Sequence, residues 1–303
     1  MKNETTHFLS ITDLTPGELE SLLGKAGELK KSARQSSQLQ GKALAYASEK
    51  PSTRTKLSFQ AAIQQLGGSY LDMTGAHMSN GKEEAKDTAR VVSGYADFFA
   101  ARVFRHAVLE EFAQYSSIPV INALSDAEHP CQALADLQTI LETKGKNATI
   151  AFVGDANNVC NSLALGTCML GLTIRVASPQ GYELEKSVKE KCQEYQGKLE
   201  IFENAQEAVQ GADAVYTDTW VSMGDESQKT ERIEKFKHYQ VNSQLMGLAK
   251  QDAVFMHCLP ATKGQEVTTE VIEGRQSIVF EQAENRLHAQ KALLLHLDGS
   301  ELQ

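Results

Sequence analysis

The sequence lacks any hydrophobic run long enough to cross a membrane. Its longest apolar stretch, around residues 163–174, contains glycines and threonines and falls short of the roughly 20 residues that a transmembrane helix needs. Proline and glycine are also sparse, with 6 and 21 copies in 303 residues, while 41% of the residues are hydrophobic and 23% are charged. This balance excludes collagenous, coiled-coil and disordered chains and is typical of a folded protein without a membrane partner.

Cysteines and cations are scarce as well. The five cysteines, an odd number, show no Cys-x-x-Cys spacing and follow a polar start that lacks the apolar segment of a signal peptide. This pattern predicts a cytoplasmic protein with reduced thiols. Acidic residues outnumber basic ones, and the net charge of −9 disfavours nucleic acid as a partner. An anionic substrate would need a local cluster of cations acting against this field.

Short β-rich runs alternate with helical patterns along the whole chain, which is typical of an α/β protein with mainly parallel sheets covered by helices. A polar stretch at 144–147 separates two such series, so we predict one domain over residues 1–143 and a second over 144–303. The last helix is apolar on more than one face, and we expect residues 284–303 to pack back onto the first domain. Strands are expected near 43–47, 70–73, 98–104 and 119–123, and then near 149–153, 174–177, 199–202, 214–217, 253–257 and 277–280.

Residues 48–55 join a predicted strand to a predicted helix, and the last four of them carry three hydroxyls and an arginine. A helix N-terminus offers unpaired N–H groups and a partial positive charge. The hydroxyls of Ser52, Thr53 and Thr55 add donors suited to a phosphate, and Arg54 adds a cation. An ordinary helix cap needs only one hydroxyl, so the cluster favours an anion site over a cap beside a surface arginine.

Polar side chains follow other predicted strands, at the sheet edge where open α/β folds bind ligands. Arg102 ends one strand, where a solvated side chain is, taken alone, the more common role. His129 and Gln132 flank the start of a helix. His129 could donate a hydrogen bond to a carbonyl oxygen while Gln132 accepts one from an amide, or the two could form a buried capping pair. Asp218 ends another strand and could hold an ammonium group or shape a turn.

Residues 255–260 read Phe-Met-His-Cys-Leu-Pro. Cys258 beside His257 suggests an activated thiolate, but neighbouring residues on a strand point to opposite faces, so we do not expect a Cys-His hydrolase. A zinc site is not expected either, because the cysteines and histidines show no recognised ligand spacing. The bond between Leu259 and Pro260 is a candidate cis peptide that would turn a backbone carbonyl into the crevice.

Six segments, taken in order, resemble the ornithine carbamoyltransferases of the aspartate/ornithine carbamoyltransferase family. The resemblance spans nearly the whole chain, and the Ser-Met-Gly and His-Cys-Leu-Pro segments point to the ornithine-specific members. It implies a carbamoyl phosphate domain followed by an ornithine domain, a homotrimer or a multiple of trimers with active sites between subunits, and no metal or organic cofactor. The implied reaction converts carbamoyl phosphate and L-ornithine into L-citrulline and phosphate in arginine biosynthesis. The segments are 52–55, 101–104, 129–132, 218–224, 257–260 and 283–286.

The resemblance also implies roles for individual residues. The catalytic residues would be Arg102, His129 and Cys258, the first two polarising the carbamoyl oxygen. Relatives use a Gln or His to reach a neighbouring subunit's phosphate site, and here Met78 or the adjacent His77 stands at that place. The other implied ligands of carbamoyl phosphate are Ser52, Thr53, Arg54, Thr55, Gln132, Leu259 and Arg286, with Arg102, His129 and Cys258 among them as well, and those of ornithine are Asn158, Asp218, Ser222 and Met223.

Three other functions remain open at this point. One is carbamoyl transfer to another amine, such as putrescine or an N-acylated ornithine, although Asp218 and the Ser-Met-Gly loop favour a free amino acid. A nucleotide-binding oxidoreductase would share the α/β pattern, but the strand–helix turn at 153–158 lacks the G-x-G-x-x-G spacing that a dinucleotide needs. The third is a binding protein without catalytic activity.

Overall fold

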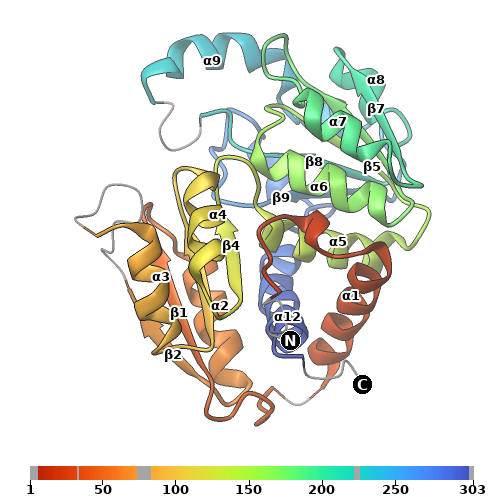
Figure 1. Cartoon of the computed structure of the whole chain (residues 1–303). Coiled ribbons are helices and arrows are strands. Elements are labelled where there is room, and N and C mark those ends of the chain that lie inside the picture. Colours follow the sequence, from red (N-terminus) through yellow and green to blue (C-terminus); the bar gives the residue numbers. More distant parts are fainter. Residues whose placement is uncertain (1–5, 33, 74–82, 222–225, 300–303) are drawn as a thin grey trace. The chain divides into compact units, whose positions relative to one another are not determined.

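Two compact units make up the chain, each built on its own parallel sheet. The computed structural model describes residues 6–32, 34–73, 83–221 and 226–299. One unit comprises Met1–Gln138 with Glu284–Gln303, and the other comprises Thr139–Ala283. In both units helices cover the sheet, so the α/β class expected from the alternating pattern is confirmed (Figure 1). Two helices, α5 (Pro130–Lys144) and α12 (Val279–Leu297), begin in one unit and end in the other.

The first unit contains a four-stranded sheet of order β2-β1-β3-β4, in which all neighbours are parallel. Ala45, Phe99 and Ala101 lie on the face that packs against α3 and α4, and the rings of Phe99 and Phe112 stack 4.1 Å apart. Tyr46 points to the opposite face. The strands are β1 (Ala43–Ser48), β2 (Ser69–Asp72), β3 (Phe98–Arg102) and β4 (Val120–Leu124), and the helices are η1 (Ile11–Asp13), α1 (Pro16–Lys31), α2 (Arg54–Gln65), α3 (Ala85–Ser93) and α4 (His106–Tyr115).

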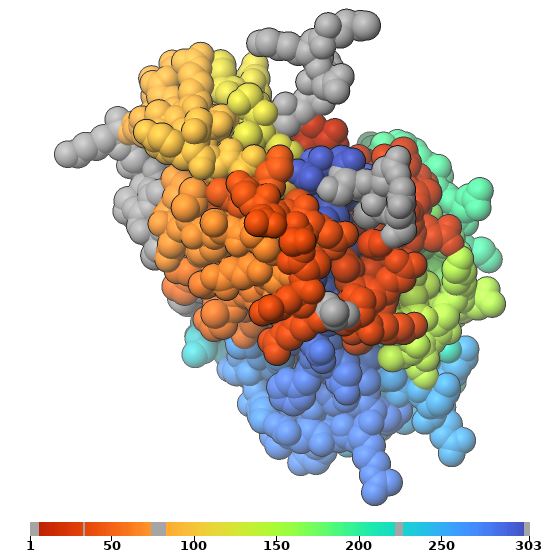
Figure 2. Space-filling model, turned by 90° about the horizontal axis from the view of Figure 1, so that it is seen from below, coloured from red at the N-terminus to blue at the C-terminus, as the bar shows by residue number. Residues whose placement is uncertain are grey.

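Local sequence explains how this unit is assembled. Helix α1 begins at a capping box in which Thr15 and Glu18 satisfy each other's backbone N–H groups, with Pro16 at the first helical position. The segment 34–42 then leads to β1; its Leu39 is fully buried and bonds through its N–H to the end of α2. Figure 2 shows this segment in orange-red, between the red atoms of α1 and the orange atoms of α2.

The second unit contains a five-stranded parallel sheet of order β7-β6-β5-β8-β9. The central strand β5 is buried along its length because α6 covers one face while α8, α10 and α11 pack on the other. The elements are β5 (Thr149–Val153), α6 (Asn158–Met169), β6 (Thr173–Ala177), α7 (Lys186–Cys192), β7 (Lys198–Phe202), α8 (Ala205–Val209), β8 (Ala214–Thr217), η2 (Glu226–Gln228), α9 (Lys229–Phe236), η3 (Lys237–Tyr239), α10 (Ser243–Met246), β9 (Val254–His257) and α11 (Thr269–Ile272).

One predicted strand is wrong. Residues 277–280 were expected to be extended, but Ser277 forms only an isolated bridge with Phe255, and α12 begins at Val279. The β-branched residues at 278 and 279 favour a strand locally, and backbone hydrogen bonds do join Gln276 and Ile278 to Phe255 of β9, but α12 begins before a longer ladder can form. The apolar faces of α12 are buried, as its pattern indicated. Even so, no helix within the described ranges is long and apolar enough to cross a bilayer.

A close approach at Gly197 provides a test of the packing in the second unit. A Cβ at this position would lie 2.5 Å from the Cα of Cys168 and 2.6 Å from the carbonyl oxygen of Leu172. Because these are backbone atoms, we expect Gly197→Ala to lower the free energy of unfolding by about 1–3 kcal/mol, measured by urea denaturation. Gly24→Ala is the control, since nothing lies within 4 Å of its added Cβ. An unchanged unfolding midpoint for Gly197→Ala would contradict the packing.

Candidate active site

The start of α2 carries hydroxyls that are not used to cap the helix. Thr53 precedes the helix with φ −82° and ψ −61° and makes no side-chain hydrogen bond to the helix backbone. Its side chain is exposed, while Ser52 is half-buried and its Oγ lies 2.8 Å from the hydroxyl of Tyr46. The simple capping alternative for this segment is therefore not observed, and the N–H groups and hydroxyls remain suited to an anion.

Arg286 joins two of the other predicted segments in the first unit. Its guanidinium donates to Thr55 Oγ1 at 2.8 Å and to Gln132 Oε1, and all three side chains are buried. Gln132 in turn donates to Asp136 Oδ1 at 2.8 Å, one turn further along α5. Residues from α2, α5 and α12 are thus held in one network around a buried cation. A buried guanidinium with such partners has a fixed geometry suited to recognising a phosphate or carboxylate.

His129 lies within this cluster of cations. Burial lowers the pKa of its imidazole well below the ordinary value, and the positive charges of Arg286, Arg102 and Arg54 lower it further. The imidazole is therefore neutral near pH 7 and can donate one hydrogen bond to a carbonyl oxygen. Cations this close to one another repel, and an anion among them offsets that repulsion.

Arg102 reaches the cluster from the end of β3. The register between β3 and β4 shifts at Ala101 and Arg102, and the carbonyl of Arg102 accepts a hydrogen bond of 2.9 Å from the N–H of Glu49. This bond ties the loop after β1 to the end of β3. The carboxyl edge of the first sheet therefore presents hydroxyls, cations and a neutral imidazole together, which is where a parallel sheet is expected to bind a ligand.

The second unit gathers a different set of groups around Asp218. One carboxylate oxygen, Oδ2, accepts a hydrogen bond of 2.8 Å from the side chain of Asn157. The other, Oδ1, accepts from the N–H of Thr219 at 2.7 Å and from the thiol of Cys258 at 2.9 Å. With three hydrogen bonds fixed in this way, a buried carboxylate is held beside a partly exposed thiol, an arrangement that can hold an ammonium group and handle its proton.

Cys258 is the thiol of this protein that a substrate can reach. It is partly exposed, whereas the other cysteines are buried. Burial raises the pKa of Cys131 to about 12 and that of Cys160 well above its ordinary value, so these two stay protonated and inert at neutral pH. The buried cysteines are Cys131, Cys160, Cys168 and Cys192.

The prediction that His257 and Cys258 point to opposite faces of a strand is wrong. Strand β9 ends at His257, so Cys258 lies beyond it and the alternation of faces no longer applies. Ligand-type atoms of Asp218, His257 and Cys258 all lie within 4.8 Å of one another. However, His257 Nδ1 accepts the N–H of Leu259 at 2.8 Å and its Nε2 lies 3.3 Å from Glu266. His257 Nδ1 is therefore occupied, whereas Nε2 faces the Glu266 carboxylate without a hydrogen bond among the described residues, and we assign no metal to this group.

The remaining predicted residues fall into two sets. Asn158 is the first residue of α6 and is half-buried beside Asn157, which caps that helix through its side chain. Leu259 has φ 57°, and its bond to Pro260 is cis, as was considered from the sequence. The other predicted residues lie outside the described ranges, namely His77, Met78, Ser222 and Met223.

Sequence reasoning missed three residues that support these clusters. Asn157 holds Asp218, and the Asn-Asn doublet after a strand was the signal for it. Arg232, buried on α9, pairs with Asp155 and donates to the carbonyl of Trp220, two residues beyond Asp218. Tyr46 contacts Ser52. Nothing in the local sequence marks Arg232, because its partner Asp155 lies 77 residues away. Tyr46 has an apolar strand position, and only the fold shows that its hydroxyl meets Ser52.

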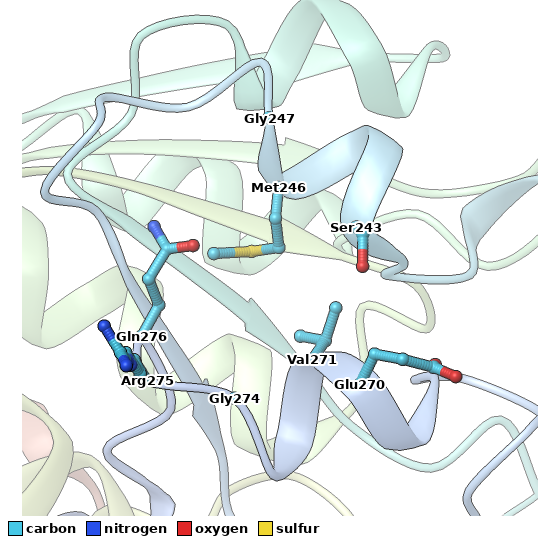
Figure 3. A pocket seen from close by; sticks show the side chains of 8 residues that line it. All are labelled: Ser243, Met246, Gly247, Glu270, Val271, Gly274, Arg275 and Gln276. Carbon is cyan, nitrogen blue, oxygen red and sulfur yellow. The ribbon is translucent and has the colours of Figure 1, made fainter.

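A cavity of about 280 Å³ lies elsewhere in the second unit and contains none of these residues. Figure 3 shows side chains from α10, α11 and the segment after α11 around it. Gln276, on its wall, donates to the carbonyl of Ala253 at 2.8 Å, just before β9 begins, whereas Cys258 follows the end of that strand. The cavity therefore belongs to the opposite edge of the sheet. Its lining residues are Ser243, Met246, Gly247, Glu270, Val271, Gly274, Arg275 and Gln276.

Two parallel-sheet units, one with a cation and hydroxyl cluster and one with a carboxylate and thiol, are what a two-domain α/β enzyme of the carbamoyltransferase class would need to bind an acyl phosphate and an amine. Family models support this: residues 6–142 match the carbamoyl-P binding domain of aspartate/ornithine carbamoyltransferase, and residues 146–297 match its Asp/Orn binding domain. The chain belongs to the aspartate/ornithine carbamoyltransferase family.

Individual relatives are similar over almost their full length. The ornithine carbamoyltransferase of Archaeoglobus fulgidus is 47% identical, covering 97% of this chain and 98% of the relative. Among solved structures, the anabolic ornithine carbamoyltransferase of Campylobacter jejuni is 41% identical with a TM-score of 0.93, covering 98% of this chain and 100% of that one. The Pyrococcus furiosus enzyme is 43% identical with a TM-score of 0.92, covering 97% of both chains.

The lowered pKa of His129 predicts a dependence of stability on pH. In the unfolded chain this imidazole takes up a proton below about pH 6.5, while the folded state keeps it neutral. Its contribution to stability is therefore complete above that pH and is lost as the pH falls. As the pH falls from about 7.5 to 5, we expect His129 to lower the free energy of unfolding by up to about 1.4 kcal/mol per pH unit, measured by urea denaturation. His129→Gln should lack this contribution. Equal slopes in the two proteins would refute this.

Proposed function

We propose that this protein is an ornithine carbamoyltransferase, which transfers the carbamoyl group of carbamoyl phosphate to the side-chain amine of L-ornithine and releases L-citrulline and phosphate. The observation that carries the proposal is the buried network in which Arg286 joins Thr55 at the start of α2 to Gln132 at the start of α5. Beside it, the positive charges of Arg286, Arg102 and Arg54 add to burial in lowering the pKa of His129. The relatives described above bear the name of this enzyme at 41–47% identity.

The first unit would bind carbamoyl phosphate. The start of α2, with Ser52, Thr53 and Arg54, would hold the phosphate through N–H groups, hydroxyls and a cation. Arg102 and His129 would donate to the carbamoyl oxygen, where negative charge develops as the amine attacks. Because phosphate leaves as an anion, Arg54 would stabilise the leaving group while Arg102 stabilises the carbamoyl oxygen. Thr55, Gln132 and Arg286, already joined by hydrogen bonds, would complete this pocket.

The second unit would bind ornithine. Asp218 would accept hydrogen bonds from the α-ammonium group, with Asn158, Ser222 and Met223 holding the rest of the amino-acid end. The side-chain amine must lose a proton before it attacks, and its pKa in water is about 10.4, like that of lysine. The thiol of Cys258, hydrogen-bonded to Asp218, is placed to orient the amine and handle that proton. We propose an orienting role for Cys258 and not a covalent one, with the Leu259 carbonyl accepting from the carbamoyl nitrogen.

The proposal extends to the domains, location and assembly of the enzyme. We propose domains over residues 1–143 and 144–303, with residues 284–303 belonging to the first, and a cytoplasmic enzyme of arginine biosynthesis that uses neither metal nor organic cofactor. A homotrimer, or a multiple of trimers, would cover the large apolar side chains that the first unit exposes, and Met78 or His77 would reach a neighbour's site. The exposed side chains include Leu57, Val91, Tyr95 and Phe104, at 59%, 49%, 75% and 46% of their surface.

A citrulline assay with purified protein, carbamoyl phosphate and a panel of amines tests the reaction. We expect citrulline from L-ornithine, with slower turnover of putrescine and N-acetylornithine; equal or faster turnover of putrescine would overturn the ornithine assignment. Arg102→Ala should lower kcat by at least about 100-fold, because it removes a charged donor to the developing oxyanion. Arg105→Ala, an exposed arginine three residues away, is the matched control and should retain activity.

Cys258→Ser tests the role of the thiol. We expect the KM for ornithine to rise about tenfold and the pH profile of kcat/KM to shift, because a hydroxyl is far less acidic than a thiol and does not form the anion that could accept the proton of the amine. The KM for carbamoyl phosphate, measured in the same assays, serves as the internal control and should stay within about twofold. Complete loss of activity with trapping of a carbamoylated thiol in the parent enzyme would instead indicate covalent catalysis.

A further inference from the structure

Tyr46 lies in the interior of the first sheet, yet its polar end reaches the candidate anion site. It sits on β1 and is fully buried, and its hydroxyl is 2.8 Å from Ser52 Oγ, six residues further along the chain. Its ring lies 6.1 Å from that of Phe59 on α2 and stacks on Tyr70 of β2 at 6.2 Å. Rings on both sides restrict the phenol, so its hydroxyl is held in place against Ser52.

The ligand determines the direction of this hydrogen bond. In a contact between two hydroxyls, one donates and the other accepts, and either arrangement fits the distance. A phosphate oxygen only accepts, so Ser52 can bind it only by donating its own hydrogen. Ser52 Oγ must then accept from Tyr46. The phenol can serve as this donor at neutral pH, because burial raises its pKa above the ordinary value.

The surroundings of the phenol support the same arrangement. The positive charges of Arg102 and Arg286 are close enough to lower the pKa of Tyr46, against the larger effect of burial. Both arginines belong to the cluster around His129. The phenol is therefore beside the cations of the candidate carbamoyl phosphate site and not only part of the core behind it.

We propose that Tyr46 is a positioning residue of this site: its phenol donates to Ser52 and so turns the Ser52 hydroxyl toward the bound phosphate. The ligand named here rests on the proposed function, whereas the hydrogen-bonded pair does not. Tyr46 touches no substrate in this arrangement and acts through Ser52 alone. Without the phenol, the Ser52 hydroxyl can rotate, and part of the ordering of the anion site is lost.

Tyr46→Phe tests this role because it removes the hydroxyl and keeps the ring that packs against Phe59 and Tyr70. We expect the KM for carbamoyl phosphate and the Kd for inorganic phosphate to rise about five- to tenfold, the effect of one lost hydrogen bond. The KM for ornithine should stay within about twofold, which general damage to the fold would not allow. If Tyr46→Phe does not fold, Tyr46→Met, which also fills the core, takes its place.

Tyr70→Phe is the matched control. It removes a buried phenol hydroxyl from the ring stacked on Tyr46, and within the described ranges that hydroxyl has no hydrogen-bond partner. We expect phosphate binding and both KM values to match those of the parent protein. A weakening of phosphate binding as large as that of Tyr46→Phe would show that the cluster of rings, and not the bond to Ser52, matters.

A double-mutant cycle with Ser52→Ala decides whether Tyr46 acts through Ser52. In the Ser52→Ala background, Tyr46→Phe should have no further effect on the Kd for inorganic phosphate. An equal effect in both backgrounds, or none in either, would overturn the proposal. Phosphate binding measured by calorimetry also separates the two proposals. If the parent protein makes no citrulline, the proposed function fails. The role of Tyr46 still stands in that case, provided that Tyr46→Phe binds phosphate more weakly than the parent protein and Tyr70→Phe does not.

Discussion

The arrangement of the first unit depends on one constraint, the burial of the Arg286 guanidinium. A buried cation must be hydrogen-bonded on several sides, and here Thr55 and Gln132 supply acceptors from two other helices. Those bonds fix the start of α2 relative to the start of α5 and place His129 in a field of positive charge that keeps its imidazole neutral. Positive charges gathered in this way repel one another, so the cluster is suited to bind an anion that offsets the repulsion.

The two units use the same architectural device for different chemistry. In each, functional side chains follow the carboxyl ends of parallel strands, where loops converge and helices begin. The first unit collects hydroxyls and cations there, whereas the second collects a carboxylate and a thiol. Asp218 is oriented by Asn157, which also caps α6, so one side chain both starts a helix and positions an acid. The buried Arg232 on α9 ties Asp155 to Trp220 near this group.

Most of the fold could be predicted because its signals are local. The runs from Thr149 to Val153 and from Ala214 to Thr217 are strands with the expected bounds. Prediction failed where local preference and long-range context disagree. Ile278 and Val279 have β-branched side chains, but the pairing with β9 stops after one bridge because α12 begins at Val279. Cys258 was assigned to a strand face although the strand ends one residue earlier, which brings His257 and Cys258 together.

What the sequence determined by itself was the kind of chemistry: hydroxyls and arginines at helix starts, Asp218 and Cys258 after strands, and an α/β pattern to carry them. The tertiary structure alone decided the partners. Arg286 contacts Thr55 across 231 residues of chain, and Arg232 reaches Asp155 across 77. Hydrogen bonds require donor and acceptor within about 3 Å, and no local pattern encodes which distant atoms will meet at that distance. Only the packing of the sheets and helices does so.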